Sequence, residues 1–475
     1  MKKQKLALHW QILIALVLGV IYGIVFTPKY EITNDVLAKL EKKQVRQGVI
    51  DSLSKLKDVK YEKNKEFVLA LKNGLNKKQF NEYNKVIIEA ASTPYIRWVS
   101  WLGDLFMRAL KMIIVPLILT SIITGVANIG HNKDLGRLGL RTIIYYTVSS
   151  LFAIVTGLFF VNVIKPGVGA DLGFSENVSE LPITQHSFKD TLLNIVPENI
   201  FQAFSTSDML AIIFFAILFG FFITRVNEKY STLLIDFFNG TFEVMMKLTH
   251  FIIRFTPIGV FGILARVVSS NDNLGELASR LGIYMLVVIA GLMFHMFVTL
   301  PSLVRVFGKV NPFKHFKAMF GVLLTAFSTS SSGATLSYTM DTVKNKVGVS
   351  NKIASFTLPL GATINMDGTA LYELVVAMFI AQAYGIHLTI GQQIIAVITA
   401  LLASIGAAGI PMAGLVMIAI VLGALGLPLE GLGLVLAVDR VLDMLRTSTN
   451  VWSDSCAAVI IAKMEGETLK IEKKK

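Results

Sequence analysis

Repeated apolar runs, each long enough to cross a lipid bilayer, are the feature that most constrains the fold of this 475-residue chain. A membrane-spanning helix needs about 20 apolar residues. Runs of that order occur at roughly 8–27, 98–128, 142–165, 209–225, 234–265 and 281–304. Charged residues make up only 16% of the sequence, against about 25% in an average soluble domain. The sequence therefore predicts an all-α polytopic membrane protein.

The net charge of +13 does not indicate a nucleic-acid partner, because Lys and Arg gather at the two ends and between the apolar runs. Lysines precede the first run and follow the last one: Lys2, Lys3, Lys5, Lys470, Lys473, Lys474 and Lys475. By the positive-inside rule both termini are expected in the cytoplasm. The single cysteine, Cys456, excludes an intramolecular disulfide.

Residues 1–28 are interpreted as the first transmembrane helix, since the run ends without the small-residue pattern of a signal-peptide cleavage site. Residues 29–94 then change abruptly to Lys, Glu, Asn and Gln with scattered apolar residues. This extramembrane polar insert should lie outside the cell. Patterns such as Phe67, Val68 and Leu71 indicate short amphipathic helices, with a disordered loop as the alternative.

The last third of the chain is apolar but is interrupted by three clusters that a simple spanning helix would not carry. Residues 326–336 (AFSTSSSGATL) and 403–414 (ASIGAAGIPMAG) are rich in small residues, which suit re-entrant tips where the backbone approaches a ligand. Between them, residues 361–373 (GATINMDGTALYE) should break a helix, so that carbonyls and Asp367 can hold a hard cation. Paired interruptions of this kind indicate the binding site of a secondary transporter.

A stripe of polar and charged side chains lies on the last apolar segment. Read as a helix, its members project from one face: Asp443, Arg446, Thr447, Asn450 and Asp454. Ionisable side chains at membrane depth are costly unless they are paired or hydrated. The stripe therefore predicts a binding site or an ion path, with the solvated edge of a soluble helix as the alternative.

Four ordered motifs carry a resemblance to a known family: the serine-rich tip, NMDGT, the ASIGAAGIPMAG tip and DMLRTSTNVWSD. Together they resemble the glutamate/aspartate transporter family, the dicarboxylate/amino acid:cation symporters that include the excitatory amino acid carriers. The resemblance covers the chain apart from the insert at 29–94. It implies eight transmembrane helices plus two re-entrant helical hairpins with inverted repeats, a homotrimer in the lipid bilayer, and an elevator mechanism.

In this frame the chain divides into a scaffold and a transport domain. Residues 1–28 and 95–280 would supply the scaffold helices, except that helix 3, at about 142–165, would belong to the transport domain. Residues 281–465 would form the transport core, with hairpin 1 at about 312–345 and hairpin 2 at about 390–425. Residues 466–475 would be a cytoplasmic tail.

The resemblance implies a substrate site around the last helix. Arg446, helped by Thr369, would hold the side-chain carboxylate of an acidic amino acid, which suits a bidentate guanidinium. Asp443 would bind the α-amino group, with Thr447 and Asn450 nearby. The backbone of the two tips would close over the α-carboxylate at Ser331, Ser332, Ile410 and Gly414.

The resemblance also implies three sodium sites made of oxygen atoms, which fit a hard cation that must be released again. The first would use Tyr146, Ser149, Ser150, Asn365 and Asp367. The second would use Gly361, Asn450 and Asp454, and the third Thr363, Met366, Ser404 and Ile405. Taken alone, the hydroxyls within 142–165 would instead be expected to bond carbonyls of their own helix.

Two features depart from the family pattern. Relatives usually carry an arginine at the place of Ser330 or of Met444, and this chain has neither; Ser337 stands where a proline is common. The charge balance near Asp443 is therefore open. Glu373 matches the glutamate that proton-coupled members use as a carrier, with a structural hydrogen bond as the alternative.

The sequence favours a sodium-coupled secondary active symporter of aspartate or glutamate in the cell membrane, with proton co-transport left open. A neutral amino acid or C4-dicarboxylate symporter of the same fold is the alternative. Arg446 argues against a neutral substrate, since its charge would stay unpaired, and Asp443 argues against a substrate without an amino group. The other classes are an intramembrane hydrolase using Ser331 or a pair of Asp residues, and an ion channel; we expect no enzyme.

Overall fold

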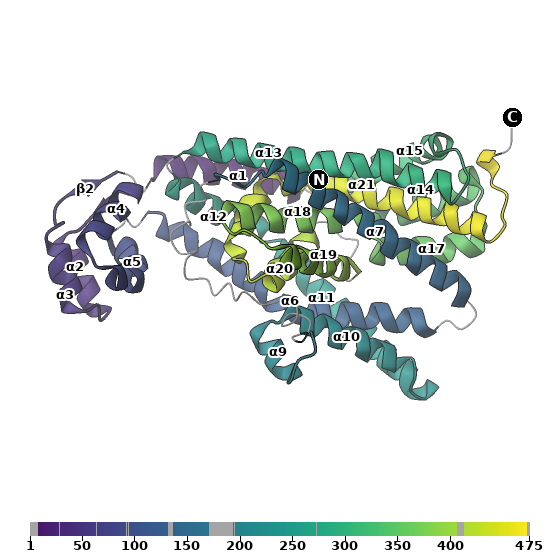
Figure 1. The fold of residues 1–475 in the computed structure, drawn as a ribbon, viewed down its shortest axis with the longest axis horizontal. Helices are drawn as coiled ribbons and strands as arrows, with labels where there is room; N and C mark the ends of the chain where they lie inside the picture. Colours follow the sequence, from purple (N-terminus) through teal and green to yellow (C-terminus); the bar gives the residue numbers. More distant parts are fainter. Residues whose placement is uncertain are drawn as a thin grey trace, which may run out of the picture. The chain divides into compact units, whose positions relative to one another are not determined.

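The structure, a computed structural model, describes residues 8–27, 29–62, 64–91, 93, 95–131, 136–170, 193, 195–271, 273–405 and 413–472. These residues are mostly α-helical, with a few π and 3-10 segments and one small sheet (Figure 1). They fall into two compact units, one within Met1–Arg108 and Arg254–Ala278 and the other within Ala109–Ala170, Ser175–Ile253 and Ser279–Lys475.

In the first unit, two apolar helices pack closely through glycines. Helix α1 (Leu8–Val25) contacts α12 (Thr256–Ser270). A Cβ atom on Gly19 would lie 2.9 Å from the carbonyl oxygen of Phe261, and one on Gly23 only 2.8 Å from that of Ala265. Any larger residue at these two positions would push the helices apart.

The polar insert is a small folded body with its own core, and the disordered alternative is wrong for its described residues. Strands β1 (Tyr30–Glu31) and β2 (Lys60–Tyr61) pair antiparallel. They accompany four helices: α2 (Asn34–Lys42), α3 (Gln47–Ser54), α4 (Asn64–Gly74) and α5 (Lys77–Ala91). Apolar side chains from these helices form one buried cluster that includes Leu40, Leu53, Phe67, Leu71 and Ile87. The amphipathic pattern therefore reflects a real packed face.

Among the described residues, four helical stretches are long and apolar enough to cross a bilayer: Arg97–Ala127, Arg137–Ile164, Leu274–Val306 and Asn351–Ala383. They belong to α6 (Arg97–His131), α7 (Gly136–Ile164), α13 (Leu274–Phe294) with η3 (His295–Thr299) and α14 (Leu300–Val306), and α17 (Asn351–Ile364) with α18 (Asp367–Ala383). Among the described residues, α7 is followed by two shorter helices, α9 (Ile200–Thr206) and α10 (Met209–Ile223).

One expected run is not a single helix. The segment at 234–265 divides into α11 (Glu228–Ile253) and α12, which begins at Thr256. Pro257 lies in the first turn of α12 and has no N–H to donate to the carbonyl of Ile253, which favours a break between α11 and α12. Sequence hydropathy alone does not reveal this break.

The last third of the chain forms a helical bundle in the second unit. Its remaining elements are α15 (Pro312–Thr329), α16 (Ser332–Thr342), η4 (Val343–Val347), α19 (Ile390–Ile405), α20 (Ala413–Ala424), η5 (Leu429–Gly431), α21 (Leu432–Met464) and η6 (Lys470–Glu472). The helices α15 and α16 pack against each other, as do α19 and α20. The long α21, yellow in Figure 1, contacts α15, α17 and α18, while α7 lies along α18.

Two features stabilise this bundle: the burial of α18 and two ion pairs between α7 and the residue after α21. Helix α18 lies at its centre. All but one of its residues are buried, which is typical of a helix at the centre of a protein interior. At one end of the bundle, Glu465 accepts hydrogen bonds from Arg137 (2.8 Å) and Arg141 (2.6 Å). The hydrogen bond and charge of Arg137, and then those of Arg141, lower the pKa of the Glu465 carboxyl. The two ion pairs connect the start of α7 to the end of α21.

Candidate functional site

The site forms where the helix made of α17 and α18 is interrupted. Helix α17 ends at Ile364 and α18 begins at Asp367, so Asn365 and Met366 lie in the break, as the sequence predicts. Helix α21 approaches this break closely, because a Cβ atom on Gly368 would lie 2.8 Å from the carbonyl oxygen of Arg446. The break therefore brings the first residues of α18 against the polar stripe of α21.

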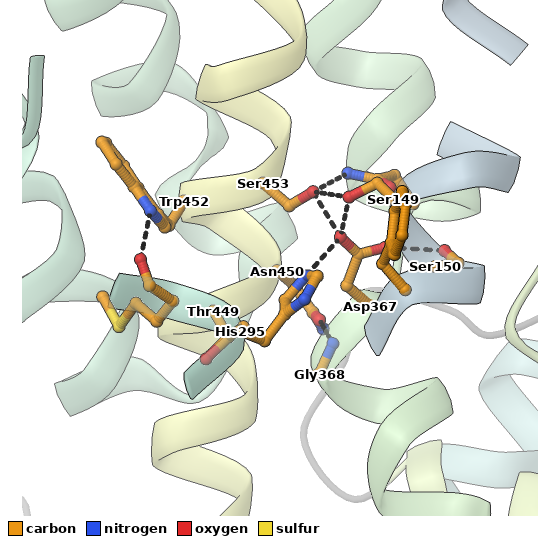
Figure 2. Close-up of polar contacts among 12 residues, drawn as sticks. Ser149, Ser150, His295, Asp367, Gly368, Thr449, Asn450, Trp452 and Ser453 are labelled. Carbon is orange, nitrogen blue, oxygen red and sulfur yellow. Dashed lines mark hydrogen bonds and ion pairs between the residues drawn. The ribbon is translucent and has the colours of Figure 1, made fainter. Parts of the chain in front are cut away.

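Asp367 is the centre of a buried hydrogen-bond cluster (Figure 2). Its Oδ2 accepts from Ser149, from Ser453 Oγ (2.6 Å) and from His295 Nε2 (3.0 Å). Its Oδ1 accepts from Ser150 Oγ (2.6 Å). The two serines of α7 thus reach across to α18 rather than bonding carbonyls of their own helix, and the resemblance predicts their position better than local geometry does.

Asn365 and Asp454 form a second group next to this cluster. Asn365 Nδ2 donates to both Ser453 Oγ and Asp454 Oδ1, each at 2.9 Å. The other amide atom, Asn365 Oδ1, is buried and has no hydrogen-bond partner in the described part of the chain. A buried oxygen without a donor is suited to a cation, because burying it unpaired is otherwise costly.

Tyr146 lies beside the second group. Its hydroxyl donates to the carbonyl of Thr357 at 2.7 Å. A Cβ atom on Gly361 would lie 2.7 Å from the Tyr146 hydroxyl and would overlap Asp454 Oδ1. Gly361, Tyr146 and Asp454 are therefore neighbours, whereas the resemblance groups Tyr146 with Asp367.

The four residues of the third expected sodium site come from the last turn of α17, the break after it and the end of α19. Helices α17 and α19 contact each other. Thr363 Oγ1 bonds the carbonyl of Leu360 at 3.0 Å, and Ser404 Oγ bonds that of Leu401 at 2.8 Å. Both hydroxyls thus bond their own helices. Met366 lies in the break and Ile405 is the last residue of α19.

Arg446 carries the charge of the expected substrate site. It is 1% exposed, and its Nη2 donates to Asp443 Oδ1 (2.8 Å) and Asp439 Oδ1 (3.1 Å). Its guanidinium carbon lies 3.8 Å from the ring centroid of Tyr372, a cation–π contact that fixes the plane of the group. Nε and Nη1 have no hydrogen-bond partner among the described residues. These two donors remain for an anionic group.

The residues expected around Arg446 make three kinds of contact: with α18, with α21 itself, and between the second tip and the guanidinium. Asn450 Oδ1 accepts from the Gly368 N–H (2.8 Å), and its Nδ2 donates to Thr369 Oγ1 (3.2 Å). Thr447 Oγ1 bonds the carbonyl of Asp443, on its own helix. A Cβ atom on Gly414 would lie 2.6 Å from Arg446 Nη1, so the start of α20 reaches the guanidinium. Ile410 lies outside the described residues.

The first tip is built by serine side chains. Ser330 has a left-handed backbone (φ 49°) that ends α15, and Ser331 Oγ caps α16 by accepting from the Ala334 N–H. Ser332 Oγ donates to the carbonyl of Ala362 at 3.3 Å. The tip is therefore attached to the last turn of α17, beside the break.

A second arginine stands near Asp443 although neither Ser330 nor Met444 supplies one. Arg440 Nη1 lies 3.6 Å from Asp443 Oδ2. Asp443 is thus flanked by two cations on its own helix, Arg440 and Arg446. This arrangement answers the question of charge balance that the sequence leaves open.

Glu373 lies one turn beyond Thr369 on α18 and is completely buried. Neither carboxyl oxygen has a hydrogen-bond partner within the described ranges. This finding does not support the structural hydrogen bond that the sequence leaves as an alternative. An isolated carboxylate is costly to bury, so this side chain is suited to carry a proton.

Four members of these clusters are not predicted from the sequence: His295, Tyr372, Asp439 and Ser453. Helical spacing could have indicated three of them. Tyr372 follows Thr369 by three residues, Asp439 precedes Asp443 by four, and Ser453 follows Asn450 by three, so each pair shares a helix face. His295 is a single polar residue in an apolar run and gives no such signal.

Comparisons with known proteins identify the family of this chain. The sequence profile of the Sodium:dicarboxylate symporter family matches residues 8–464. A protein of Bacillus caldotenax named Proton/sodium-glutamate symport protein is 39% identical over 373 residues, covering 77% of this chain and 87% of the relative. Human Excitatory amino acid transporter 3 is 37% identical over 419 residues, covering 77% and 79%. This chain therefore belongs to the sodium:dicarboxylate symporter family.

Proposed function

We propose that this chain is a sodium-coupled symporter of acidic amino acids, aspartate or glutamate. It is a transporter, as its family and relatives are, and not an enzyme. The observation that carries the substrate class is the buried Arg446, whose Nε and Nη1 lack partners in the described chain and whose Nη2 is held by two carboxylates. Such a guanidinium is pre-oriented for a third, incoming carboxylate.

The charges around Arg446 favour an amino acid over the alternative substrates. The side-chain carboxylate would accept from Arg446 Nη1, which has no partner in the described chain, with Thr369 nearby. The α-ammonium would take Asp443, and the α-carboxylate would meet the tips at Ser331, Ser332 and Gly414. A neutral amino acid would leave Nε and Nη1 of Arg446, which have no partner in the described chain, without an acceptor. A dicarboxylate would bring no ammonium group to offset the charges of Asp439 and Asp443.

Sodium would bind in the two residue clusters described above, one around Asp367 and one around Asp454. Asp367 with Ser149 and Ser150 would form one site, and Asp454 with Asn365 and Gly361 another. Binding of sodium and substrate would be coupled because Asn450 contacts both Gly368 and Thr369, one and two residues after Asp367. Transport then requires that sodium and substrate are bound together, because the carrier changes conformation only when all of these sites are occupied.

At the level of the assembly, the proposal includes eight transmembrane helices, two re-entrant hairpins (α15 with α16 and α19 with α20) and an elevator movement of the transport core. It also includes a homotrimer in the cell membrane with both termini cytoplasmic. The hairpin proposal is supported by the packing of α15 on α16 and of α19 on α20.

Coupling can be tested in purified protein by measuring binding. Aspartate should lower the sodium concentration at half-saturation, and sodium should lower the aspartate dissociation constant by the same factor, because linkage between two sites is reciprocal. Both can be measured by thermal shift, with potassium replacing sodium as the control. Independent binding of the two ligands would contradict the proposal.

Replacing Gly361 by Ala should weaken sodium binding by about tenfold, because the added methyl group would overlap Asp454 Oδ1 and press on Tyr146, and overpacking of this kind costs about 1–3 kcal/mol. The sodium dependence of aspartate uptake measures the effect. Gly282→Ala in α13 is the matched control, because a Cβ atom there meets nothing within 4 Å among the described residues. Equal sodium dependence in the two variants would count against the second site.

Replacing Glu373 by Gln should abolish the pH dependence of net uptake and leave aspartate exchange intact. The amide keeps the shape of the side chain but cannot bind and release a proton. Uptake and exchange are to be measured between pH 5.5 and 8 in the same proteoliposomes. An unchanged pH profile of net uptake would exclude Glu373 as the proton carrier.

A further inference from the structure

His295 contacts Asp367 from a distorted turn of helix. The segment η3, His295–Thr299, is π-helical, and the N–H of Leu300 bonds the carbonyl of His295, five residues before it. In this pattern the carbonyl of Met296 would need the N–H of residue 301, which is Pro301 and has none. The π-helical turn therefore leaves one carbonyl in the bundle interior without a backbone donor.

Trp452 of α21 supplies that donor. Its Nε1 donates to the Met296 carbonyl at 3.0 Å (Figure 2). The indole also packs against His315, with ring centroids 4.6 Å apart, and against Phe316, at 5.4 Å. A buried and packed tryptophan thus bonds the turn that carries His295, one residue from the bonded carbonyl.

The imidazole differs from the other donors to Asp367. A serine hydroxyl rotates and carries two lone pairs besides its proton, so Ser149, Ser150 and Ser453 can each turn an oxygen lone pair toward a cation. His295 faces a carboxylate that only accepts, so Nε2 carries the proton. Its Nδ1 meets no partner among the residues described. The contact with Oδ2 is therefore the one that persists whether or not a cation is bound.

We propose that His295 is a positioning residue that orients the Asp367 carboxylate for sodium, by holding Oδ2 and leaving Oδ1, beside Ser150, directed at the ion. This inference rests on the proposed sodium coupling. Groups that orient a ligand of a metal ion typically contribute about 10- to 100-fold to its affinity. His295 does not contact the Arg446 cluster in any described hydrogen bond, so its effect should be on sodium and not on the substrate.

The experiment is a sodium titration of thermal stability in purified protein without substrate. His295→Phe, which keeps a ring but loses the donor, should raise the half-effect sodium concentration about tenfold. His295→Gln, which keeps an N–H donor, should restore most of the wild-type value. His315→Phe is the matched control, because this equally buried histidine packs on the same Trp452, and its ring nitrogens have no partner in the described chain. Its midpoint should change less than twofold.

The outcomes separate this inference from the proposed function. Wild-type protein that is stabilised equally by sodium and potassium would contradict sodium coupling itself. If wild type responds to sodium and the Phe and Gln variants share its midpoint, or shift equally, the positioning role is wrong. Should His295→Phe fail to fold, His295→Met is the second variant without a donor, and the same comparison with His295→Gln decides. Aspartate affinity at saturating sodium should stay at the wild-type value in His295→Gln and in whichever donorless variant folds.

Discussion

Replacing Arg446 by Cys should lower aspartate uptake by about 100-fold or more, because truncating one partner of a buried charge pair costs about 2–5 kcal/mol. The guanidinium is 1% exposed, and its Nε and Nη1 have no hydrogen-bond partner in the described chain. The smaller, neutral side chain should instead permit uptake of serine or alanine. Labelled uptake into proteoliposomes measures both effects.

This substitution needs a control for charge. Arg446 also pairs with Asp439 and Asp443, and its loss leaves two carboxylates buried together. Combining Arg446→Cys with Asp439→Asn removes one of them, and the double variant should regain stability without regaining aspartate uptake. An aspartate half-saturation that is unchanged in the single variant would refute the role of Arg446.

Replacing Asp367 or Asp454 by Asn should raise the sodium concentration needed for half-maximal uptake by about tenfold or more. Each carboxylate supplies the only negative charge in its described group, and hard cations depend on charged oxygen ligands. Asp341→Asn is the control, because this exposed residue of α16 bonds Asn345 and lies outside both groups. Wild-type sodium titrations in both site variants would contradict the sodium assignment.

Much of the site follows from the sequence because membrane burial makes polar residues informative. Asp443, Arg446, Asn450 and Asp454 share one face of α21, and helical spacing alone places them together. The break at Asn365 and Met366 was predictable for the same reason, since Asn, Asp and Gly interrupt a helix that is otherwise apolar.

Other contacts could not be predicted from one sequence. Long-range packing decides that Ser149 and Ser150 reach Asp367 and that Tyr146 points to Thr357. His295 lies in a π-helical turn that precedes Pro301 and accepts a hydrogen bond from Trp452 at the Met296 carbonyl, and Pro301 and Trp452 are 151 positions apart. For the insert, the amphipathic pattern predicted helices, but it did not predict whether these helices would share a core.

The most direct test of sodium-coupled transport of acidic amino acids is uptake of labelled aspartate, glutamate, serine and succinate into proteoliposomes. Each substrate is offered under an inward sodium gradient, an inward proton gradient, both, or neither. We expect saturable accumulation of aspartate or glutamate above equilibrium that requires sodium, with little serine or succinate. Accumulation that persists when potassium replaces sodium, or that favours serine or succinate, would contradict the account.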